Sequence, residues 1–124
     1  MLSLSKTIED YSLQDLMKLI EEILNKNPIP IQEVTAIYQF DIHGEEEESC
    51  QLHFQDGRAA VSKDMNAAAD CTLKMSLANF RLFLLGKLNG TMAFMTGKLK
   101  IQGDIGKALK IESILRQYNV KEHI

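Results

Sequence analysis

The sequence predicts an α+β fold in which helices cover one face of a five-stranded, mostly antiparallel sheet. Two segments near the ends of the chain carry apolar residues at helical spacing, and several segments between them alternate apolar and polar residues. Strands and helices that fall in separate runs usually form an antiparallel sheet with helices packed on one face. The 124 residues suit one domain, expected to span residues 1–124 with its core over about 13–115.

The first expected helix runs from Ser12 to Asn25. Its apolar residues recur at intervals of three and four, and Ser12 followed by Asp15 is typical of a helix N-cap. The Asn27–Pro30 segment ends this helix, because a residue that precedes proline disfavours helical backbone angles.

Four expected strands follow the first helix, and all but the weakly marked third alternate apolar and polar residues. The run Glu45–Glu48 is expected to form a polar turn between the first two, and Asp56-Gly57 predicts a tight hairpin between the second and third. The expected strands cover residues 34–42, 50–55, 58–62 and 71–76.

The C-terminal third predicts a helix, a strand and a helix. Ser76 can cap a helix from Leu77 to about Leu88, and a short apolar piece covers 91–96. A fifth strand is expected over 98–102, and Asp104 can cap a last amphipathic helix.

Composition favours a cytoplasmic globular protein. The Met1–Asp10 segment lacks the apolar stretch of a secretory leader, and no window reaches 18 apolar residues. The net charge of −3 hides an asymmetry, since residues 1–80 carry −8 and residues 81–124 carry +5. The basic part could approach phosphates or an anionic membrane, or its charges could simply be solvated.

The side chains that usually perform chemistry are not grouped. Cys50 and His53 would point to opposite faces of a strand, so they cannot share a metal ion. The Gly-x-x-Gly spacing at 103–106 contains Asp104, which argues against a nucleic-acid clamp. We therefore expect no enzyme activity, no metal, no cofactor and no nucleic-acid partner.

The stretch Leu77–Met95 carries more apolar side chains than a small sheet can cover. Leucines lie on several sides of its helix, so another helix, a partner or a ligand must cover them, unless all belong to an ordinary core. Beyond that helix, Gly90 and Gly97 flank a segment that holds Met92, Phe94 and Met95, and that could act as a gate.

These same residues resemble a known family. The stretches 68–75, 80–88 and 93–104, with the ordered motifs Gly97-Lys98-Leu99, Lys100-Ile101, Gly103-Asp104 and Ala108-Leu109, are similar to the sterol carrier protein 2 domain. The resemblance implies a hydrophobic tunnel between helices and sheet that holds fatty acids, fatty acyl-CoAs, phospholipids or sterols. The ending Lys121-Glu122-His123-Ile124 lacks a peroxisomal signal, so we expect a bacterial-type cytoplasmic member with ligands other than sterols.

By position, the resemblance places ten residues in the lipid site. They are Phe80, Phe83, Leu84, Met92, Phe94, Met95, Leu99, Ile101, Ile105 and Leu109, with Phe40, Leu52 and Phe54 as weaker candidates. Lys98, Lys100, Lys107 or Lys110 could meet a carboxylate or phosphate head group.

Two functions therefore stand as expectations. One is the binding of long-chain lipids, with their transfer between membranes as a further expectation, by a monomer or weak dimer that makes transient contact with an anionic membrane. The other is a non-catalytic interaction or dimerisation module whose apolar helix 77–88 packs on a partner.

Overall fold

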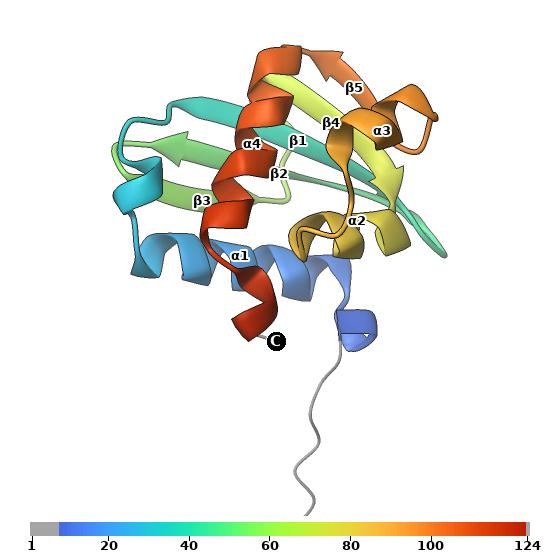
Figure 1. Ribbon diagram of the computed structural model, residues 1–124. Helices are drawn as coiled ribbons and strands as arrows, with labels where there is room; N and C mark the ends of the chain where they lie inside the picture. The colour runs from blue at the N-terminus through green and yellow to red at the C-terminus, as the bar shows by residue number, and fades with distance from the viewer. Residues whose placement is uncertain (1–7, 124) are drawn as a thin grey trace, which may run out of the picture.

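The structure is a computed structural model that describes residues 8–123, without the side chains of Lys121 and His123. Most of the Met1–Asp10 segment considered above for a leader lies outside the described residues. Figure 1 shows a twisted sheet with its helices gathered on one side. The elements in chain order are η1 (Ile8–Asp10), α1 (Leu13–Lys26), η2 (Ile29–Ile31), β1 (Ala36–His43), β2 (Glu47–Gln55), β3 (Arg58–Ser62), β4 (Cys71–Ser76), α2 (Leu77–Leu84), α3 (Gly90–Met95), β5 (Lys100–Gly103), α4 (Ile105–Gln117) and η3 (Val120–His123).

The five strands form one sheet in the order β3-β2-β1-β4-β5. Neighbouring strands are antiparallel except for β1 and β4, which run parallel with Tyr38 opposite Cys71. The α+β class and the mostly antiparallel five-stranded sheet are therefore confirmed. The parallel pair arises because the chain returns from the β3 edge to the far side of β1.

The inner face of the sheet forms the core beneath the helices. Alternate residues of β1 and β4 are buried, as the period of two in a strand requires. The Tyr38 and Phe54 rings meet edge to face with centroids 5.8 Å apart, and Phe40 packs on Phe80 of α2 at 5.3 Å. The weaker lipid-site candidates Phe40, Leu52 and Phe54 are all within 2% of full burial in this core.

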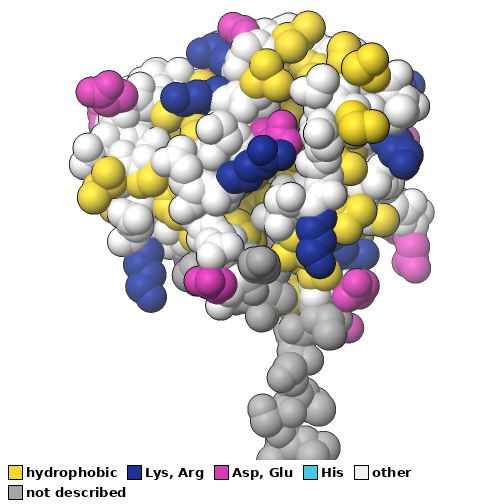
Figure 2. Space-filling view, viewed as in Figure 1, with side chains coloured by type: hydrophobic (Ala, Val, Ile, Leu, Met, Phe, Trp, Pro, Cys, Tyr) yellow, Lys and Arg dark blue, Asp and Glu magenta, His cyan; other side chains and the backbone are white. Residues whose placement is uncertain are grey.

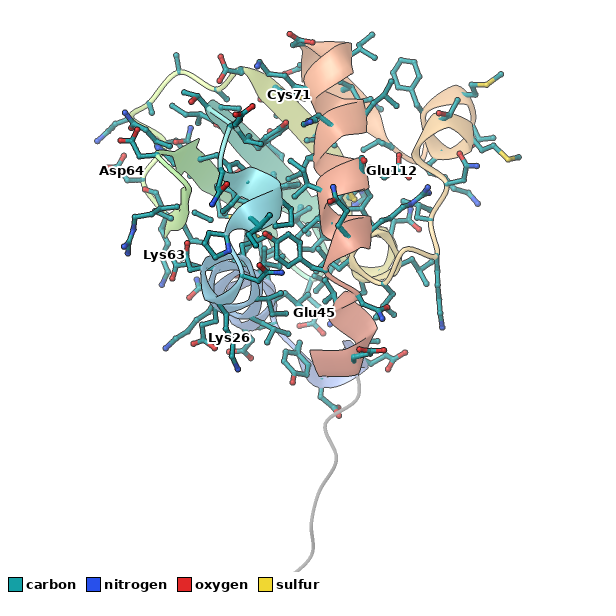
Figure 3. The ribbon with its side chains drawn as sticks, turned by 60° about the vertical axis from the view of Figure 1, so that its left-hand side comes forward. Lys26, Glu45, Lys63, Asp64, Cys71 and Glu112 are labelled. Carbon is teal, nitrogen blue, oxygen red and sulfur yellow. The ribbon has the colours of Figure 1, made fainter. Side chains whose placement is uncertain are left out.

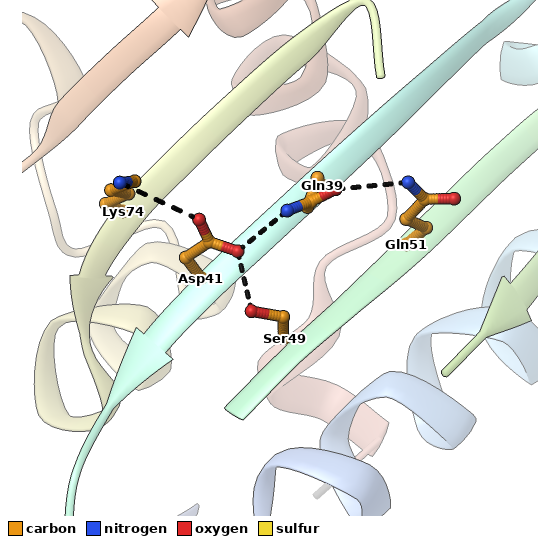
Figure 4. A network of polar contacts seen from close by, with 5 residues as sticks. All are labelled: Gln39, Asp41, Ser49, Gln51 and Lys74. Carbon is orange, nitrogen blue, oxygen red and sulfur yellow. Dashed lines mark hydrogen bonds and ion pairs between the residues drawn. The ribbon is translucent and has the colours of Figure 1, made fainter. Parts of the chain in front are cut away.

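The outer face of the sheet is polar. Figure 4 shows a network there in which Gln51 Nε2 donates to Gln39 Oε1 at 3.1 Å, and Gln39 Nε2 donates to Asp41 Oδ1 at 3.0 Å. Ser49 and Lys74 add a 2.7 Å hydrogen bond and a 4.0 Å ion pair to the same carboxylate. Gln51 is fully buried because the β3–β4 connection crosses it, and its amide also donates to the Ala67 carbonyl at 2.9 Å. The network satisfies buried polar atoms and stabilises this face.

Helix α1 covers the sheet near β3 and protects that edge strand. Ser12 and Asp15 form a capping box at its N-terminus, which confirms the predicted cap. The Asn25 amide bonds both the N–H and the carbonyl of Ala59 at 2.8 Å, and a Glu21 oxygen accepts the Val61 N–H at 2.8 Å. Three backbone groups that an edge strand would otherwise leave free are thus paired.

Several predicted boundaries are wrong. The helix expected over 77–88 ends at Leu84, because Gly86 takes a φ of +73° and a Schellman motif closes the helix. In that motif the Lys87 N–H donates to the Leu82 carbonyl at 2.9 Å, and the Gly86 N–H donates to the Phe83 carbonyl at 3.1 Å.

The other differences concern strand ends and one short helix. The second strand begins at Glu47, so Glu47 and Glu48 of the expected polar turn pair with the end of β1. Charged residues are tolerated in this part of the strand because their side chains are exposed to solvent. The first strand begins at Ala36 and the fifth covers 100–103. The short apolar piece over 91–96 is a capped helix, α3.

Gly103, at the end of β5, allows this strand to lie close to the start of β4. Its φ is +91°, and an added Cβ would lie 2.5 Å from the Asp70 carbonyl oxygen of the neighbouring strand end. Gly86 has a similar φ, but an added Cβ there would meet open space.

We predict that Gly86→Ala lowers the free energy of unfolding by about 1–2 kcal/mol, and that Gly103→Ala lowers it by about 3–4 kcal/mol. Urea denaturation followed by circular dichroism measures both, and equal losses would contradict the close approach of β4 and β5.

Candidate functional site

An apolar pocket of about 150 Å³ lies at the β5 end of the sheet, where α3 and α4 come together. Figure 1 places α3 beside β5 at the upper right, and the first turns of α4 cross in front of the sheet there. The lining residues are Phe83, Gly90, Thr91, Phe94, Leu99, Ile101, Ile105, Ala108, Leu109 and Glu112.

Helical and strand periods bring these side chains together. Residues Ile105, Leu109 and Glu112 are four and three apart on α4, so they lie along one side of that helix. On β5, Ile101 faces the helices, whereas its neighbours Lys100 and Gln102 point to the opposite face. Phe83 of α2 is buried at the inner side of the pocket.

Helix α3 forms one wall and is fixed mainly at its ends. The Asn89 side chain accepts the Met92 N–H at 3.0 Å, and Gly97, with a φ of +81°, closes the other end. The Lys98 N–H then donates to the Ala93 carbonyl at 2.8 Å in a second Schellman motif. The buried residues of α3 are Gly90 and Ala93, so this helix contributes little to the core.

The Glu112 carboxylate links α4 to the start of α3. It accepts the Gly90 N–H at 3.0 Å and pairs with Arg116 at 3.0 Å, and its side chain is 14% exposed. Figure 3 shows Glu112 extending from α4 toward the segment that leads into α3. A Cβ at position 90 would lie 2.6 Å from a carboxylate oxygen, so glycine is required for this contact.

The structure brings together six of the ten expected lipid-site residues. Phe83, Phe94, Leu99, Ile101, Ile105 and Leu109 line the pocket. Phe80 and Leu84 lie in the core under α2, where Phe80 packs on Phe40. Met92 and Met95 are 62% and 78% exposed on the outer side of α3 and do not line the pocket.

Sequence reasoning missed four lining residues, Gly90, Thr91, Ala108 and Glu112. Helical spacing could have identified Glu112, because it lies on the same side of the helix as Ile105 and Leu109. It was overlooked because only apolar residues were taken as candidates for the lipid site. Likewise, Gly90 indicated a hinge in the sequence, although its role in the structure is to let Glu112 approach.

The four lysines considered for a head group lie outside the apolar pocket. Lys107 and Lys110 border a separate cavity of about 620 Å³ on the η2 side of α4, together with Glu33. Lys98 and Lys100 are exposed and do not line the pocket. Any anion that these lysines meet would therefore lie at the surface.

The buried thiols and phenols are held in their neutral forms. Burial raises the pKa of Cys50 to about 12 and that of Cys71 to about 11, with nearby carboxylates adding to both shifts. Burial also raises the pKa of Tyr38, whose hydroxyl donates to the Lys107 carbonyl of α4 at 2.8 Å. Neutral thiols are poor nucleophiles, so neither cysteine is activated for covalent catalysis.

Residues 8–123 lack two features that mark other classes of protein. No helix in this range is long and apolar enough to cross a membrane. In the same range, no three His, Cys, Asp or Glu side chains are grouped closely enough to hold a metal ion.

By its fold and pocket, this chain is a small α+β domain with an apolar pocket between its helices and one end of its sheet. The model of the SCP-2 sterol transfer family matches residues 12–116, and this chain belongs to that family. The resemblance drawn from the Gly97–Asp104 motifs is thereby confirmed.

Relatives and solved structures agree with this assignment. Hydroxysteroid dehydrogenase-like protein 2 of Xenopus tropicalis is 39% identical over 118 residues, which are 94% of this chain and 28% of the relative. The chain therefore spans less than a third of that relative. The solution structure of sterol carrier protein domain 2 of Helicoverpa armigera matches with a TM-score of 0.75 and 29% identity over 94% of this chain and 95% of the other. Apo sterol carrier protein 2 of Yarrowia lipolytica gives a TM-score of 0.69 and 30% identity, covering 85% and 90% of the two chains.

The contact between Glu112 and Gly90 yields a stability prediction. Glu112→Ala leaves the buried Gly90 N–H without its partner and should lower the free energy of unfolding by about 1–3 kcal/mol. Arg116→Ala removes only the exposed ion pair four residues away and should cost about 0.3–0.5 kcal/mol. Parallel urea titrations compare the two variants. Similar losses would show that the ion pair, and not the contact with α3, accounts for the effect of Glu112.

The raised thiol pKa values yield a pH prediction. In the unfolded chain a thiol ionises near pH 8.5, whereas Cys50 and Cys71 stay protonated in the fold until about pH 12 and 11. The contribution of the protonated thiols to the free energy of unfolding is therefore fully present below about pH 8.5 and is lost as the pH rises toward 11–12.

The same burial predicts that a disulfide reagent at pH 8 labels both thiols much more slowly in native protein than in urea. Equally fast labelling would contradict their burial.

Proposed function

We propose that this domain binds long-chain apolar lipids, namely fatty acids, fatty acyl-CoAs or phospholipids, with the tail in the pocket between α3, α4 and β5. The observation that carries the proposal is that nearly all of the lining is apolar, with three half-exposed side chains, Phe94, Ile105 and Leu109, at its edge. Family membership supports a lipid ligand, since the names of the matching structures describe sterol carrier proteins. We further propose that bound lipid is passed between membranes.

A long chain needs more space than the pocket offers in this structure. The pocket holds about 150 Å³, whereas pockets for small organic ligands usually hold about 300–1,000 Å³. The most economical enlargement is an outward movement of α3, which is held by its two caps and by Glu112 and buries little of its own surface. The expected gate, Gly90–Gly97, thus becomes a movable wall that opens the pocket into the tunnel implied by the family.

The pocket favours an orientation with the tail inside. The Glu112 carboxylate lies in its wall and would repel a fatty acid carboxylate buried beside it. The exposed lysines of this part of the chain, Lys98, Lys100 and Lys110, suit a carboxylate or phosphate better. A head group at the surface with its tail inward satisfies both constraints.

Burial of methylene groups supplies the binding free energy. Each methylene removed from water contributes about 0.8 kcal/mol, so a chain of about 14 carbons gains on the order of 11 kcal/mol before ordering costs. This contribution has no preferred direction, so we expect affinity to follow chain length more than chemical detail.

The alternative, an interaction module built on helix 77–88, has less support. The apolar residues Phe80, Phe83 and Leu84 of α2 are within 3% of full burial inside this chain. Leu82 is 39% exposed, and one such leucine does not make an interface. We therefore propose lipid binding without catalysis as the function of this domain.

Chain length and one pocket variant test the proposal. In competition with a fluorescent fatty acid, affinity for saturated fatty acids should rise about fourfold per carbon from 8 carbons until the pocket is full. Leu109→Gln places an amide against the tail and should weaken binding about tenfold or more. The matched control is Ile29→Gln, because Ile29 is also exposed but lies on η2, away from this pocket. Flat chain-length dependence, or equal effects of both variants, would refute the assignment.

A further inference from the structure

The apolar pocket between α3, α4 and β5 contains one charged side chain, that of Glu112. The other side chains of its lining are apolar, except for Thr91, which is exposed at the surface. Figure 2 shows hydrophobic side chains gathered over α3 and the first turns of α4, with acidic and basic side chains close to them. A polar group in the wall of an apolar pocket usually fixes the orientation or the identity of the ligand. The contacts of Glu112 therefore bear on which lipid the pocket selects.

The two carboxylate oxygens of Glu112 have different surroundings. Oε2 accepts the Gly90 N–H at 3.0 Å and a hydrogen bond from Nη2 of Arg116 at 3.0 Å. Oε1 has no hydrogen-bond partner among residues 8–123, although a carboxylate oxygen can accept two hydrogen bonds. Oε1 is nevertheless not sealed in the core, since within the same residues the one buried side-chain atom without a partner is Nε of Arg81. One acceptor thus stays open at this place.

The open oxygen lies on the pocket side of Glu112. A Cβ at Gly90, which also lines the pocket, would lie 2.6 Å from Oε1 and 3.2 Å from Oε2. Along α4, the side chains of Ile105 and Leu109 are about half exposed, whereas that of Glu112 is 14% exposed. Glu112 follows Ile105 by seven residues, a rise of about 10 Å along the helix. Oε1 is therefore at the inner end of the pocket.

A purely apolar tail would leave this oxygen without a partner. Such a tail displaces water from Oε1 and offers no hydrogen-bond donor in return. Leaving an acceptor unsatisfied is unfavourable, and more so when the acceptor is charged. A hydroxyl group at the same place would donate a charge-assisted hydrogen bond to Oε1, which is stronger than one between neutral groups.

The charges around Glu112 favour a hydroxyl over an ammonium or a carboxylate. Arg116, at 3.0 Å, already balances the negative charge of Glu112, so a cationic ligand gains little from it. A ligand carboxylate would bring a second negative charge and no donor. A hydroxyl supplies the donor that Oε1 lacks and adds no charge.

We propose that Glu112 determines specificity, and that the pocket prefers long-chain lipids that carry a hydroxyl on the buried part of the tail, where it donates to Oε1. This inference rests on the proposed lipid binding with the tail inward. It adds one polar preference to an affinity that otherwise follows chain length. The carboxylate or phosphate of such a lipid stays at the surface, and its second polar group reaches Glu112.

Pairs of isomeric hydroxy fatty acids test the preference. In each pair, of one chain length, one isomer carries its hydroxyl on the last carbon and the other carries it beside the carboxylate, so that it stays at the surface. Both compete with a fluorescent fatty acid for wild-type protein. At the length that places the terminal hydroxyl at Glu112, the terminal isomer should bind about tenfold more tightly. Shorter and longer pairs should show a smaller difference.

Variants at position 112 test whether this residue causes the preference. Glu112→Met removes both oxygens and should reverse the preference, because a buried hydroxyl then has no partner. Glu112→Gln keeps one acceptor oxygen and should keep part of the preference. The control Arg116→Ala leaves the carboxylate in place and should keep the preference. Each result is a ratio of two affinities for one protein, so a general loss of stability, as when Glu112→Met also frees the Gly90 N–H, cancels.

Three results would overturn the role of Glu112. These are equal affinities of the two isomers at every length, a preference that survives Glu112→Met, or one that Arg116→Ala removes as fully as Glu112→Met does. Failure of unsubstituted fatty acids to bind wild-type protein at all would instead refute the proposed lipid site. Failure of the specificity and failure of lipid binding are therefore distinguishable.

Discussion

The position of α4 across the sheet is the constraint on which the site depends. The Tyr38 hydroxyl, at the centre of the core, donates to the Lys107 carbonyl at 2.8 Å, and Tyr118 at the other end of α4 donates to the Asn27 carbonyl at 2.6 Å. Helix α1 packs on β3 at one edge of the sheet, and α4 contacts β5 at the other edge. The six residues of α3 cover that edge incompletely, and the pocket lies beneath them.

The same arrangement separates a rigid part of the molecule from a part suited to movement. The core under α1 and α2 is closely packed, with Phe40 and Phe80 in ring contact. In contrast, α3 is held by an asparagine cap, a glycine in a left-handed conformation and the Glu112 carboxylate. These contacts are few, so the proposed displacement of α3 would cost little compared with unfolding. A lipid tail that fills the enlarged space would compensate for that cost with apolar burial.

The sequence predicted the sheet better than the site. Alternation predicted β4 with the observed bounds, because a half-buried strand leaves a period of two in its residues, whereas β3 was predicted from the Asp56-Gly57 turn that precedes it. The ends of α2 and α3 depend on backbone bonds around Gly86 and Gly97, which hydrophobic spacing does not record. Hydrophobicity also could not distinguish Phe80 in the core, Leu99 at the pocket and Met95 at the surface, since that depends on where α3 stands relative to α4. Glu112 was missed because its partner is a backbone N–H from a segment 22 residues away.

The most direct measurement is the set of nuclear Overhauser contacts between a bound, protonated fatty acid and the methyl groups of isotope-labelled protein. The account predicts contacts from the acyl chain to Leu99, Ile101, Ile105 and Leu109, together with shifts of the α3 amide resonances that exceed those of α1. Contacts confined to the cavity beside η2 and Lys110, or a bound lipid that leaves α3 undisturbed, would contradict it.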